Sequence, residues 1–418
     1  MPHSAPTSSS SAGRSVGGAS GRIVVAGALR TPIGRFMGGL SELSAADLGT
    51  SLVSALLARS GADPKALASA TDELIFGNGR QAGGGPNVAR QISFRAGLGE
   101  GVPAWTLNMA CGSGLKAIAL AAESIAAGRN QVVIAGGVES MSGLPFFLPQ
   151  MRKGYRLGHA PVVDAMYQDG FQCPIADMLM GATAEKLARQ LEISRHDQDE
   201  FALNSQRKAG AAIAAGRFVD EIAPVTVPGR KGDTVVAADE HPRPDTSMAA
   251  LAKLPPVFDP QNGTVHAGNS SGITDGAAAL LITSERAAER LGLTPLAFVG
   301  ATRQAGVDPT IMGIGPVPAV RALEEANGVG VDGYDLIELN EAFAAQVIAC
   351  ARELRLPMDR VNVNGGAIAL GHPIGATGAR IVVTMLHELA RRGGRSGLAT
   401  LCISGGMGIA TAFDREGL

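Results

Sequence analysis

Three short glycine-containing segments of this chain each carry a residue that could do nucleophilic or acid–base chemistry. In the first, Cys111 stands between a predicted strand and an Ala-rich predicted helix at 113–127. A helix N-terminus presents free N–H groups and a partial positive charge, which lower the pKa of a thiol and can hold an oxyanion. A buried structural cysteine is the alternative. Cys111 is therefore a candidate nucleophile, with a thiol pKa expected below its ordinary value.

The other two segments carry His372 and Cys402. His372 lies among the glycines of 365–378, where an imidazole can polarise a thiol or a carbonyl. Cys402 ends an apolar strand and enters the turn at 404–408. Backbone N–H groups exposed in such a turn suit a developing negative charge. A loop histidine and a core cysteine are the plain structural alternatives.

A fourth segment, with the sequence Asn-Glu-Ala-Phe at 340–343, follows a predicted strand and begins a predicted helix. Asn340 could cap that helix, because asparagine is a favoured N-cap residue. It could instead orient a water molecule. The residues alone leave both interpretations open.

The elements that position these segments occur twice in the chain. The repeated pairs are 72–78 with 335–340, 107–114 with 363–366, and 131–137 with 399–406. The spacing from Asp72 to Cys111 nearly equals the spacing from Asp335 to His372. Two similar α/β halves packed back to back would place their equivalent loops on one rim, where open α/β sheets bind ligands. The duplication therefore predicts that His372 lies near Cys111.

Length and composition predict two core domains and an insertion. The chain has 418 residues, of which 45% are hydrophobic and only 4% aromatic, so small aliphatic residues must build tightly packed α/β layers. Prolines, charges and polar runs at 141–272 indicate an inserted loop domain. We place it between an N-terminal half at 21–140, completed by 273–294, and a C-terminal half at 295–418. The Ser-, Ala- and Gly-rich residues 1–20 predict a disordered tail, with a weak organellar presequence as the alternative.

Charge and cysteine usage argue against several classes of protein. The formal net charge of -2 lacks the basic excess of a nucleic-acid surface. No apolar run approaches the roughly 20 residues needed to span a bilayer. The four cysteines form neither a CxxC pair nor a dense framework, so neither a zinc site nor a disulfide scaffold is indicated. We expect a cytoplasmic protein with no metal, no nucleic acid partner and no membrane partner.

One further motif suggests a different enzyme class. Residues 77–82 match the GxGxxA pattern of dinucleotide-binding folds, but the Gly-Gly-Gly-Pro run at 83–86 interrupts the helix that should follow. The sequence therefore disfavours a dehydrogenase.

Taken together, the reactive segments resemble the thiolase family. The matching segments are those around Cys111, 340–343, 371–373, and Cys402 with the following glycines. The resemblance runs over about residues 22–412. It implies a thiolase fold, which is a duplicated five-layered αβαβα arrangement with an inserted loop domain. It also implies a reversible Claisen condensation of two acetyl-CoA molecules to acetoacetyl-CoA and CoA through a cysteine acyl-enzyme. Thiolases are usually dimers or tetramers, so we expect a homo-oligomer such as a homotetramer, and no cofactor because coenzyme A is a substrate.

The resemblance also implies a role for each reactive residue. Cys111 would be the nucleophile that takes the acyl group, and His372 would activate it. Cys402 would move the proton at Cα of the second acyl-CoA. Asn340 would hold a water that forms one oxyanion site with His372, and the backbone N–H groups of Cys111 and Ser404 would form the other. Thiolases usually have glycine where this chain has Ser404, whose φ is more restricted.

Substrate contacts follow from the same resemblance. The residues implied in coenzyme A and acyl binding are Arg243, Ala267, Ser271, Met180, Met312, Ala342 and Phe343. The two methionines resemble the pair that narrows the acyl pocket for short chains. Leu179 stands where the acetoacetyl-CoA branch carries a histidine, so one pantetheine contact is lost. A broad-chain 3-ketoacyl-CoA thiolase of fatty-acid degradation is therefore the alternative.

Two more distant alternatives can be compared on the same residues. Condensing enzymes of the ketoacyl-synthase type pair a cysteine with two histidines, or with a histidine and an asparagine, whereas the second catalytic position here is Cys402. A non-catalytic acyl-CoA-binding scaffold would be expected to lose a reactive residue, whereas this chain keeps all four. Both comparisons favour a catalytic thiolase.

Overall fold

The computed structural model describes residues 21–418, and the disordered tail predicted at 1–20 lies outside the described residues. The strands of the N-terminal half are β1 (Ile23–Arg30), β2 (Gly34–Arg35), β3 (Glu73–Gly77), β4 (Ala104–Leu107), β5 (Val132–Glu139) and β12 (Thr274–Ser284). Those of the C-terminal half are β13 (Ala297–Gly306), β14 (Leu336–Leu339), β15 (Ser396–Ile403) and β16 (Met407–Asp414). The two halves share one hydrogen-bonded path in the order β14-β15-β16-β13-β1-β12-β5-β3-β4.

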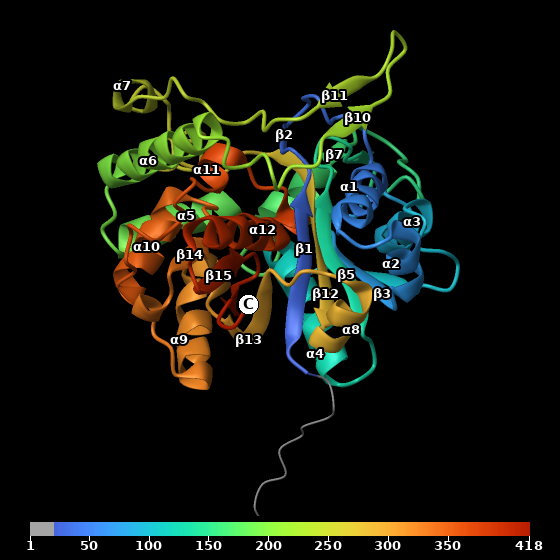
Figure 1. Ribbon diagram of the computed structural model, residues 1–418. Coiled ribbons are helices and arrows are strands. Elements are labelled where there is room, and N and C mark those ends of the chain that lie inside the picture. Colours follow the sequence, from blue (N-terminus) through green and yellow to red (C-terminus); the bar gives the residue numbers. More distant parts are fainter. Residues whose placement is uncertain (1–20) are drawn as a thin grey trace, which may run out of the picture.

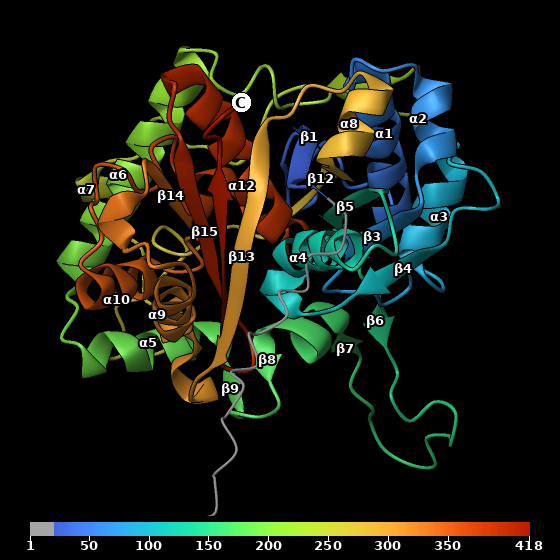
Figure 2. The same cartoon turned by 60° about the horizontal axis from the view of Figure 1, so that its bottom comes forward.

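Helices complete five alternating layers of helix and sheet. The outer helices of the N-terminal half are α1 (Ala45–Arg59), α2 (Pro64–Ala70), α3 (Val88–Arg95) and α8 (Glu285–Leu291). Those of the C-terminal half are α9 (Pro316–Asn327) and α10 (Ala344–Leu354). The middle layer consists of α4 (Ser113–Ala126) and α12 (Ile374–Arg392), which lie between the two halves of the sheet (Figure 2). The predicted five-layered α/β fold is confirmed.

The predicted duplication is visible in the strand order. The N-terminal order β3-β5-β12-β1 is repeated in the C-terminal half as β14-β15-β16-β13. In the same way α4 and α12 are equivalent helices, each following the loop that carries a reactive residue. They pack against each other at Gly114 and Gly378 and are neighbours in Figure 2, so the two loops open on the same rim.

Two glycines allow the central helices to approach each other closely. A Cβ atom at Gly114 would lie 2.7 Å from the backbone nitrogen of Ala379, and one at Gly378 would lie 2.4 Å from that of Leu115. Both distances are shorter than real carbon contacts, so a larger residue would push the helices apart. Packing in this layer is tight enough that such displacement would move the loops at the helix starts.

Local signals of the sequence produce the elements as predicted. Ser44 caps α1 in a capping box with Asp47. Every residue of β5 is buried, as expected of a continuous apolar strand covered on both faces. The predicted helix at 113–127 is α4, which ends one residue earlier.

The segment at 141–272 runs over the rim and one side of the core. It forms three small sheets, which are β6 (Phe146–Phe147) with β7 (Val163–Asp164), β8 (Gln172–Cys173) with β9 (Met178–Leu179), and β10 (Val225–Val227) with β11 (Thr234–Val236). Its helices are η2 (Tyr167–Phe171), α5 (Met180–Gln190), α6 (Arg195–Ala214) and α7 (Met248–Leu251). The connection between β6 and β7 projects from the body in Figure 2. The exact domain boundaries stay a prediction.

Four short helices fill connections of the core. They are η1 (Ala110–Gly112), η3 (Pro309–Ile314), η4 (Val331–Gly333) and α11 (Ala367–Leu370). Over residues 21–418, no helix combines the length and apolar character that crossing a bilayer would require.

Candidate active site

Cys111 lies in η1, the tight turn that leads into α4. The residue before it, Ala110, has a φ of 45°, a left-handed conformation that is costly for a residue other than glycine. The turn is held on both sides, because Ala110 N–H donates to Asn108 Oδ1 at 2.9 Å and Ser113 Oγ donates to Ala110 O at 2.7 Å. The strained turn thus presents the thiol of the half-buried Cys111 at the start of a helix, as the sequence predicts.

His372 reaches the same point from the other half. The residue before it, Gly371, has a φ of 104°, and a Cβ there would lie 2.4 Å from Thr274 Cγ2, so both conformation and space require glycine. His372 Nε2 lies 3.3 Å from Cys111 Sγ. The structure therefore brings together the two residues that the duplication predicts to be neighbours.

Cys402 lies at the end of β15 in a small apolar cluster. The members of this cluster are Cys402, Met312 and Ala342, with Met180 and Phe343 packed against them. All five are residues that the sequence analysis selected for the site. They come from four separate segments of the chain, so the fold assembles a compact apolar cluster around the second thiol.

Asn340 is buried without a hydrogen-bond partner. It is 1% exposed, and neither Oδ1 nor Nδ2 has a protein partner among the described residues. The alternative that Asn340 caps a helix is wrong, because α10 begins at Ala344 with Phe343 at its N-cap. Buried amides are normally paired, so these two atoms are available to a water or a substrate.

Two backbone N–H groups lie beside the Cys111 sulfur, those of Ser404 and of Cys111 itself, and both favour its thiolate. Ser404 is not among the described residues with positive φ, whereas the following Gly405 and Gly406 have φ of 87° and 83°. Serine in place of the usual glycine at position 404 therefore does not strain the backbone, and the N–H donor of this residue is kept.

Burial controls the ionisation of the three reactive groups. Burial raises the pKa of the Cys111 thiol, although Arg80 and the two N–H groups oppose the rise. The lowered thiol pKa expected from the sequence is therefore wrong, because loss of solvent outweighs the helix N-terminus. Burial, with Arg380 and Arg80, lowers the pKa of His372 to about 3. Burial also raises the pKa of Cys402 well above its usual range. At neutral pH the site holds two thiols and a neutral imidazole.

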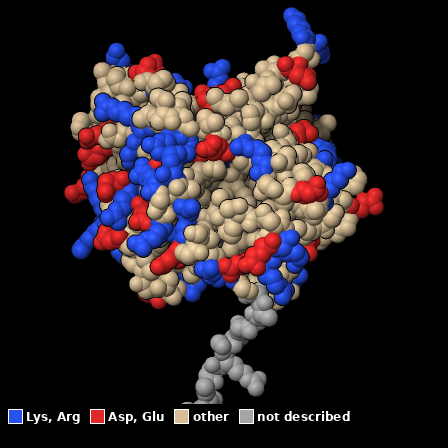
Figure 3. All heavy atoms as spheres, viewed as in Figure 1, with Lys and Arg blue, Asp and Glu red and all other residues tan. Residues whose placement is uncertain are grey.

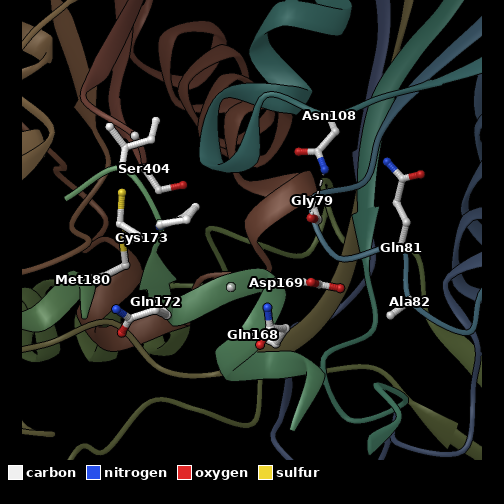
Figure 4. A pocket seen from close by; sticks show the side chains of 14 residues that line it. Gly79, Gln81, Ala82, Asn108, Gln168, Asp169, Gln172, Cys173, Met180 and Ser404 are labelled. Atoms are coloured by element: carbon white, nitrogen blue, oxygen red, sulfur yellow. Dashed lines mark hydrogen bonds between the residues drawn. The ribbon is translucent and has the colours of Figure 1, made fainter. Parts of the chain in front are cut away.

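A pocket of about 490 Å³ lies beside this cluster (Figure 4). Its wall includes Met180 and Ser404 and is otherwise formed by Gly79, Gln81, Ala82, Asn108, Gly405 and most of 168–175. Part of that wall is η2, a π-helix, and π-helical turns often occur at functional sites. The pocket lies next to the turn after β15, since Ser404 and Gly405 form part of its wall.

Comparisons with known proteins fit this geometry. The family model described as the thiolase N-terminal domain matches residues 23–286, and that described as the thiolase C-terminal domain matches residues 293–415. The chain belongs to the thiolase family. As a thiolase it has the predicted fold and the predicted enzyme class, an acyltransferase.

Relatives of this thiolase align over nearly its whole length. The acetyl-CoA acetyltransferase of Pseudomonas aeruginosa is 50% identical over 395 residues, which cover 94% of this chain and 99% of that protein. The acetyl-CoA acetyltransferase of Escherichia coli is 50% identical over 393 residues, covering 94% of this chain and 98% of that protein.

Solved structures of other thiolases share the fold of this chain. The Bacillus anthracis acetyl-CoA acetyltransferase superposes with a TM-score of 0.91 at 43% identity, covering 94% of this chain and 99% of that one. Human mitochondrial 3-ketoacyl-CoA thiolase superposes with a TM-score of 0.89 at 41% identity, covering 94% and 98%. The two names differ in the substrate they imply, so fold similarity alone does not choose between short and longer acyl chains.

The residues predicted to contact coenzyme A fall into two groups. Ser271 belongs to a loop that packs on the catalytic segment, since its N–H donates to Ala342 O at 3.0 Å and Ser270 pairs with Phe343. The exposed Ala267 lies on the same loop. Arg243 is exposed and lies outside the cluster around Cys402.

Glu139 is a residue that the sequence analysis missed. This buried carboxylate accepts hydrogen bonds from Asn78 Nδ2 (2.6 Å), Arg80 N (3.0 Å), Gly79 N (3.0 Å) and Gly375 N (2.8 Å). It therefore ties the loop after β3 to the first turn of α12, which begins two residues after His372. A lone carboxylate at the end of an apolar strand was the available signal.

Arg80 was missed for a different reason. It belongs to the GxGxxA match at 77–82, and that pattern is typical of dinucleotide-binding folds and gives no indication of a thiolase site. Its guanidinium is buried against Gly170 and acts electrostatically on both Cys111 and His372. The motif thus belongs to the wall of the thiolase site. Over residues 21–418, no group of three or more His, Cys, Asp or Glu residues could hold a metal ion.

The unpaired amide of Asn340 leads to a prediction that separates function from stability. Asn340→Leu should lower kcat by about 10²-fold, because the role predicted for Asn340 in one oxyanion site is then lost. The melting temperature should stay equal or rise, because an unpaired buried amide is replaced by an apolar group of similar shape. Steady-state kinetics and thermal unfolding measure the two effects.

The matched control is Asn269→Leu. Asn269 is equally buried, but it donates to Asp199 Oδ1 and Thr264 O and accepts from His266 N–H. This variant should melt at a clearly lower temperature. A comparable loss of stability in Asn340→Leu would contradict the view that Asn340 is free for a water or a substrate.

Proposed function

We propose that this thiolase catalyses the reversible condensation of two acetyl-CoA molecules to acetoacetyl-CoA and CoA. The observation that carries the proposal is the packing of Met180 and Met312 against Cys402 and Ala342. Two long side chains beside the second thiol leave little length for an acyl chain. The names of the relatives from Pseudomonas aeruginosa and Escherichia coli support the same substrate.

In the first half-reaction, Cys111 Sγ attacks the carbonyl carbon of acetyl-CoA. His372 Nε2, 3.3 Å away, takes the thiol proton as the sulfur–carbon bond forms, because the raised thiol pKa keeps Cys111 protonated beforehand. The N–H groups of Cys111 and Ser404 stabilise the oxyanion. CoA leaves with the proton from His372, and the acetyl group stays on Cys111.

In the second half-reaction, Cys402 first gives its thiol proton to His372 and then, as the thiolate, takes a proton from Cα of a second acetyl-CoA. Asn340, through a water, and His372 stabilise the enolate oxygen. The Cα carbanion attacks the acetyl carbonyl and the carbon–carbon bond forms. The Cys111 sulfur leaves and takes back a proton from the protonated His372, 3.3 Å away. Each step conserves protons within the set of His372 and the two cysteines, so we propose that no metal or cofactor takes part.

Positively charged side chains support the binding of the phosphates of coenzyme A. Lys and Arg side chains gather over α6 on the face shown in Figure 3, where they suit the phosphates of coenzyme A. Arg243 is anchored to α6 through its N–H, which donates to Gln206 Oε1 at 2.9 Å. We assign Arg243 to the phosphate and adenine end, and Ala267 and Ser271 to the pantetheine.

We also propose that the enzyme is a homo-oligomer, a dimer or a tetramer, that works in the cytoplasm. Several large apolar side chains are exposed on the segment at 146–167, including Phe146, Met151 and Leu157, which favours contact with another copy. All four cysteines are free, which suits a reducing compartment.

The test of the substrate is CoA-dependent cleavage of acetoacetyl-CoA beside a medium-chain 3-ketoacyl-CoA. We expect fast cleavage of acetoacetyl-CoA and slow cleavage of the longer substrate. Met312→Ala should raise the medium-chain rate relative to the acetoacetyl rate by about tenfold, because the pocket lengthens. Met385→Ala, which opens a similar space in the central core away from the site, should leave the ratio unchanged.

Equal wild-type rates on both substrates would favour the broad-chain 3-ketoacyl-CoA alternative, with Leu179 as the first residue to examine. Cleavage of neither substrate would favour the non-catalytic scaffold.

A further inference from the structure

A chain of hydrogen bonds continues from His372 away from the reactive thiol. His372 Nδ1 lies 2.6 Å from Thr377 Oγ1. The same hydroxyl donates to Pro373 O at 3.0 Å. Thr377 is fully buried in the first turn of α12, so water does not compete for these bonds.

Counting hydrogens assigns the tautomer of the imidazole. A threonine hydroxyl has one hydrogen, and here Pro373 O accepts it. With that hydrogen donated to Pro373 O, Thr377 Oγ1 accepts from His372, which favours the tautomer of the neutral imidazole with the hydrogen on Nδ1. Nε2 is left with a free lone pair, and it is the nitrogen that faces Cys111 Sγ at 3.3 Å.

We propose that Thr377 is a positioning residue, which fixes His372 in the Nδ1–H tautomer so that Nε2 can take the proton of the Cys111 thiol. This inference rests on the proposed function for its catalytic consequence, although the tautomer itself does not depend on the substrate. In the opposite tautomer a hydrogen on Nε2 would point at the sulfur, and the imidazole could not accept the thiol proton.

The charged groups around His372 cannot fix its tautomer, which leaves Thr377 as the residue that does. The charged and titratable groups that act on His372 are Arg380 of α12, Arg80 of the loop after β3, and Cys111 itself. Neither arginine can accept a hydrogen from Nδ1. Without the hydroxyl, Nδ1–H would be buried and unpaired, which removes the preference for that tautomer.

The test compares three variants of two threonines on the same helix. Thr377→Val keeps the shape of the side chain and removes the hydroxyl, whereas Thr377→Ser keeps the hydroxyl. Thr384→Val is the matched control, because Thr384 is also buried and its hydroxyl donates to Glu221 Oε1 at 3.1 Å. Thr384 thus reports the cost of losing a buried hydroxyl in α12 without contact with His372.

Two rates are measured for each protein, single-turnover acetylation by acetyl-CoA and alkylation of Cys111 by iodoacetamide over a range of pH. We expect acetylation by Thr377→Val to fall by about 10²-fold with little change in KM, and alkylation near neutral pH to fall with it. Thr377→Ser should stay within about threefold of wild type, and Thr384→Val should acetylate normally even if it melts earlier. Wild-type rates in a folded Thr377→Val protein, or an equal loss in Thr384→Val, would overturn the proposal.

Two features keep this test separate from the proposed function. Alkylation needs no acyl-CoA, so it reports the pairing of His372 with Cys111 even if the substrate assignment fails. If Thr377→Val does not fold, nitrogen NMR of ¹⁵N-histidine-labelled wild-type protein decides instead, with the His372 signals identified by their absence in His372→Gln. Nδ1 shifts typical of N–H and Nε2 shifts typical of an unprotonated nitrogen support the proposal, and the reverse pattern overturns it.

Discussion

Cys111→Ala should leave a folded protein that no longer cleaves or forms acetoacetyl-CoA and carries no acetyl group after exposure to acetyl-CoA. The expected loss of turnover is about 10⁴-fold or more, because removal of a nucleophile eliminates the covalent route altogether. Steady-state thiolysis and intact-protein mass spectrometry measure the two effects. The fold should survive, since the turn at Cys111 is held by bonds of Ala110, Asn108 and Ser113, not by the thiol.

Cys350→Ala is the control for this variant. Cys350 is buried in the outer core of the C-terminal half, and its thiol donates to Gly313 O at 3.3 Å. Burial raises its pKa to about 12, so it is not a nucleophile at neutral pH. Cys350→Ala should still be acetylated. An acetylated and active Cys111→Ala protein would show that the nucleophile is a different residue.

Cys402→Ala should divide the reaction into its two halves. Acetyl transfer to Cys111 should proceed, because the nucleophile, His372 and the two N–H donors remain in place. Condensation should fall by about 10²–10⁴-fold, the usual contribution of a general acid–base group. Rapid quench with labelled acetyl-CoA would therefore find acetyl-enzyme that accumulates without acetoacetyl-CoA.

The contrast between the two cysteine variants is itself informative. Normal condensation by Cys402→Ala would mean that another base moves the Cα proton. Loss of acetylation in Cys402→Ala would mean that the variant disturbs the apolar cluster formed with Met312 and Ala342. Cys402→Ser, which keeps the size of the side chain, would then separate the two effects.

The sequence predicted the parts of the site that depend on local pattern and on the duplication. The turn before α4 and the turn after β15 follow from glycines and apolar strands that can be recognised in short windows. The meeting of Cys111 and His372 is a long-range fact, yet it was predictable because the chain repeats the same strand, loop and helix in both halves. The internal duplication thus supplied long-range information that a short stretch of sequence does not contain.

The parts that were not predicted depend on tertiary contacts without such a repeat. Glu139 accepts hydrogen bonds from backbone N–H groups of the loop after β3 and of the first turn of α12, and no local feature marks these partners. The π-helix η2, which forms one wall of the pocket, falls in a segment of mixed polarity that gives no clear periodicity.

The ionisation of Cys111 was predicted with the wrong sign for a related reason. A helix N-terminus is visible in a sequence, but the loss of solvent around a side chain is not. In the folded protein burial dominates and raises the pKa of the thiol. The consequence for mechanism is concrete: His372 must remove the proton during the attack, which gives the tautomer fixed by Thr377 its importance.

The measurement that tests the central claim most directly is peptide mapping of the protein after brief exposure to acetyl-CoA and an acid quench. We expect one acetyl group per chain, carried as a thioester on the peptide that contains Cys111, and its rapid discharge when CoA is added. An acetyl group on Cys402 or on another residue, or a protein that takes up none while remaining folded, would contradict it.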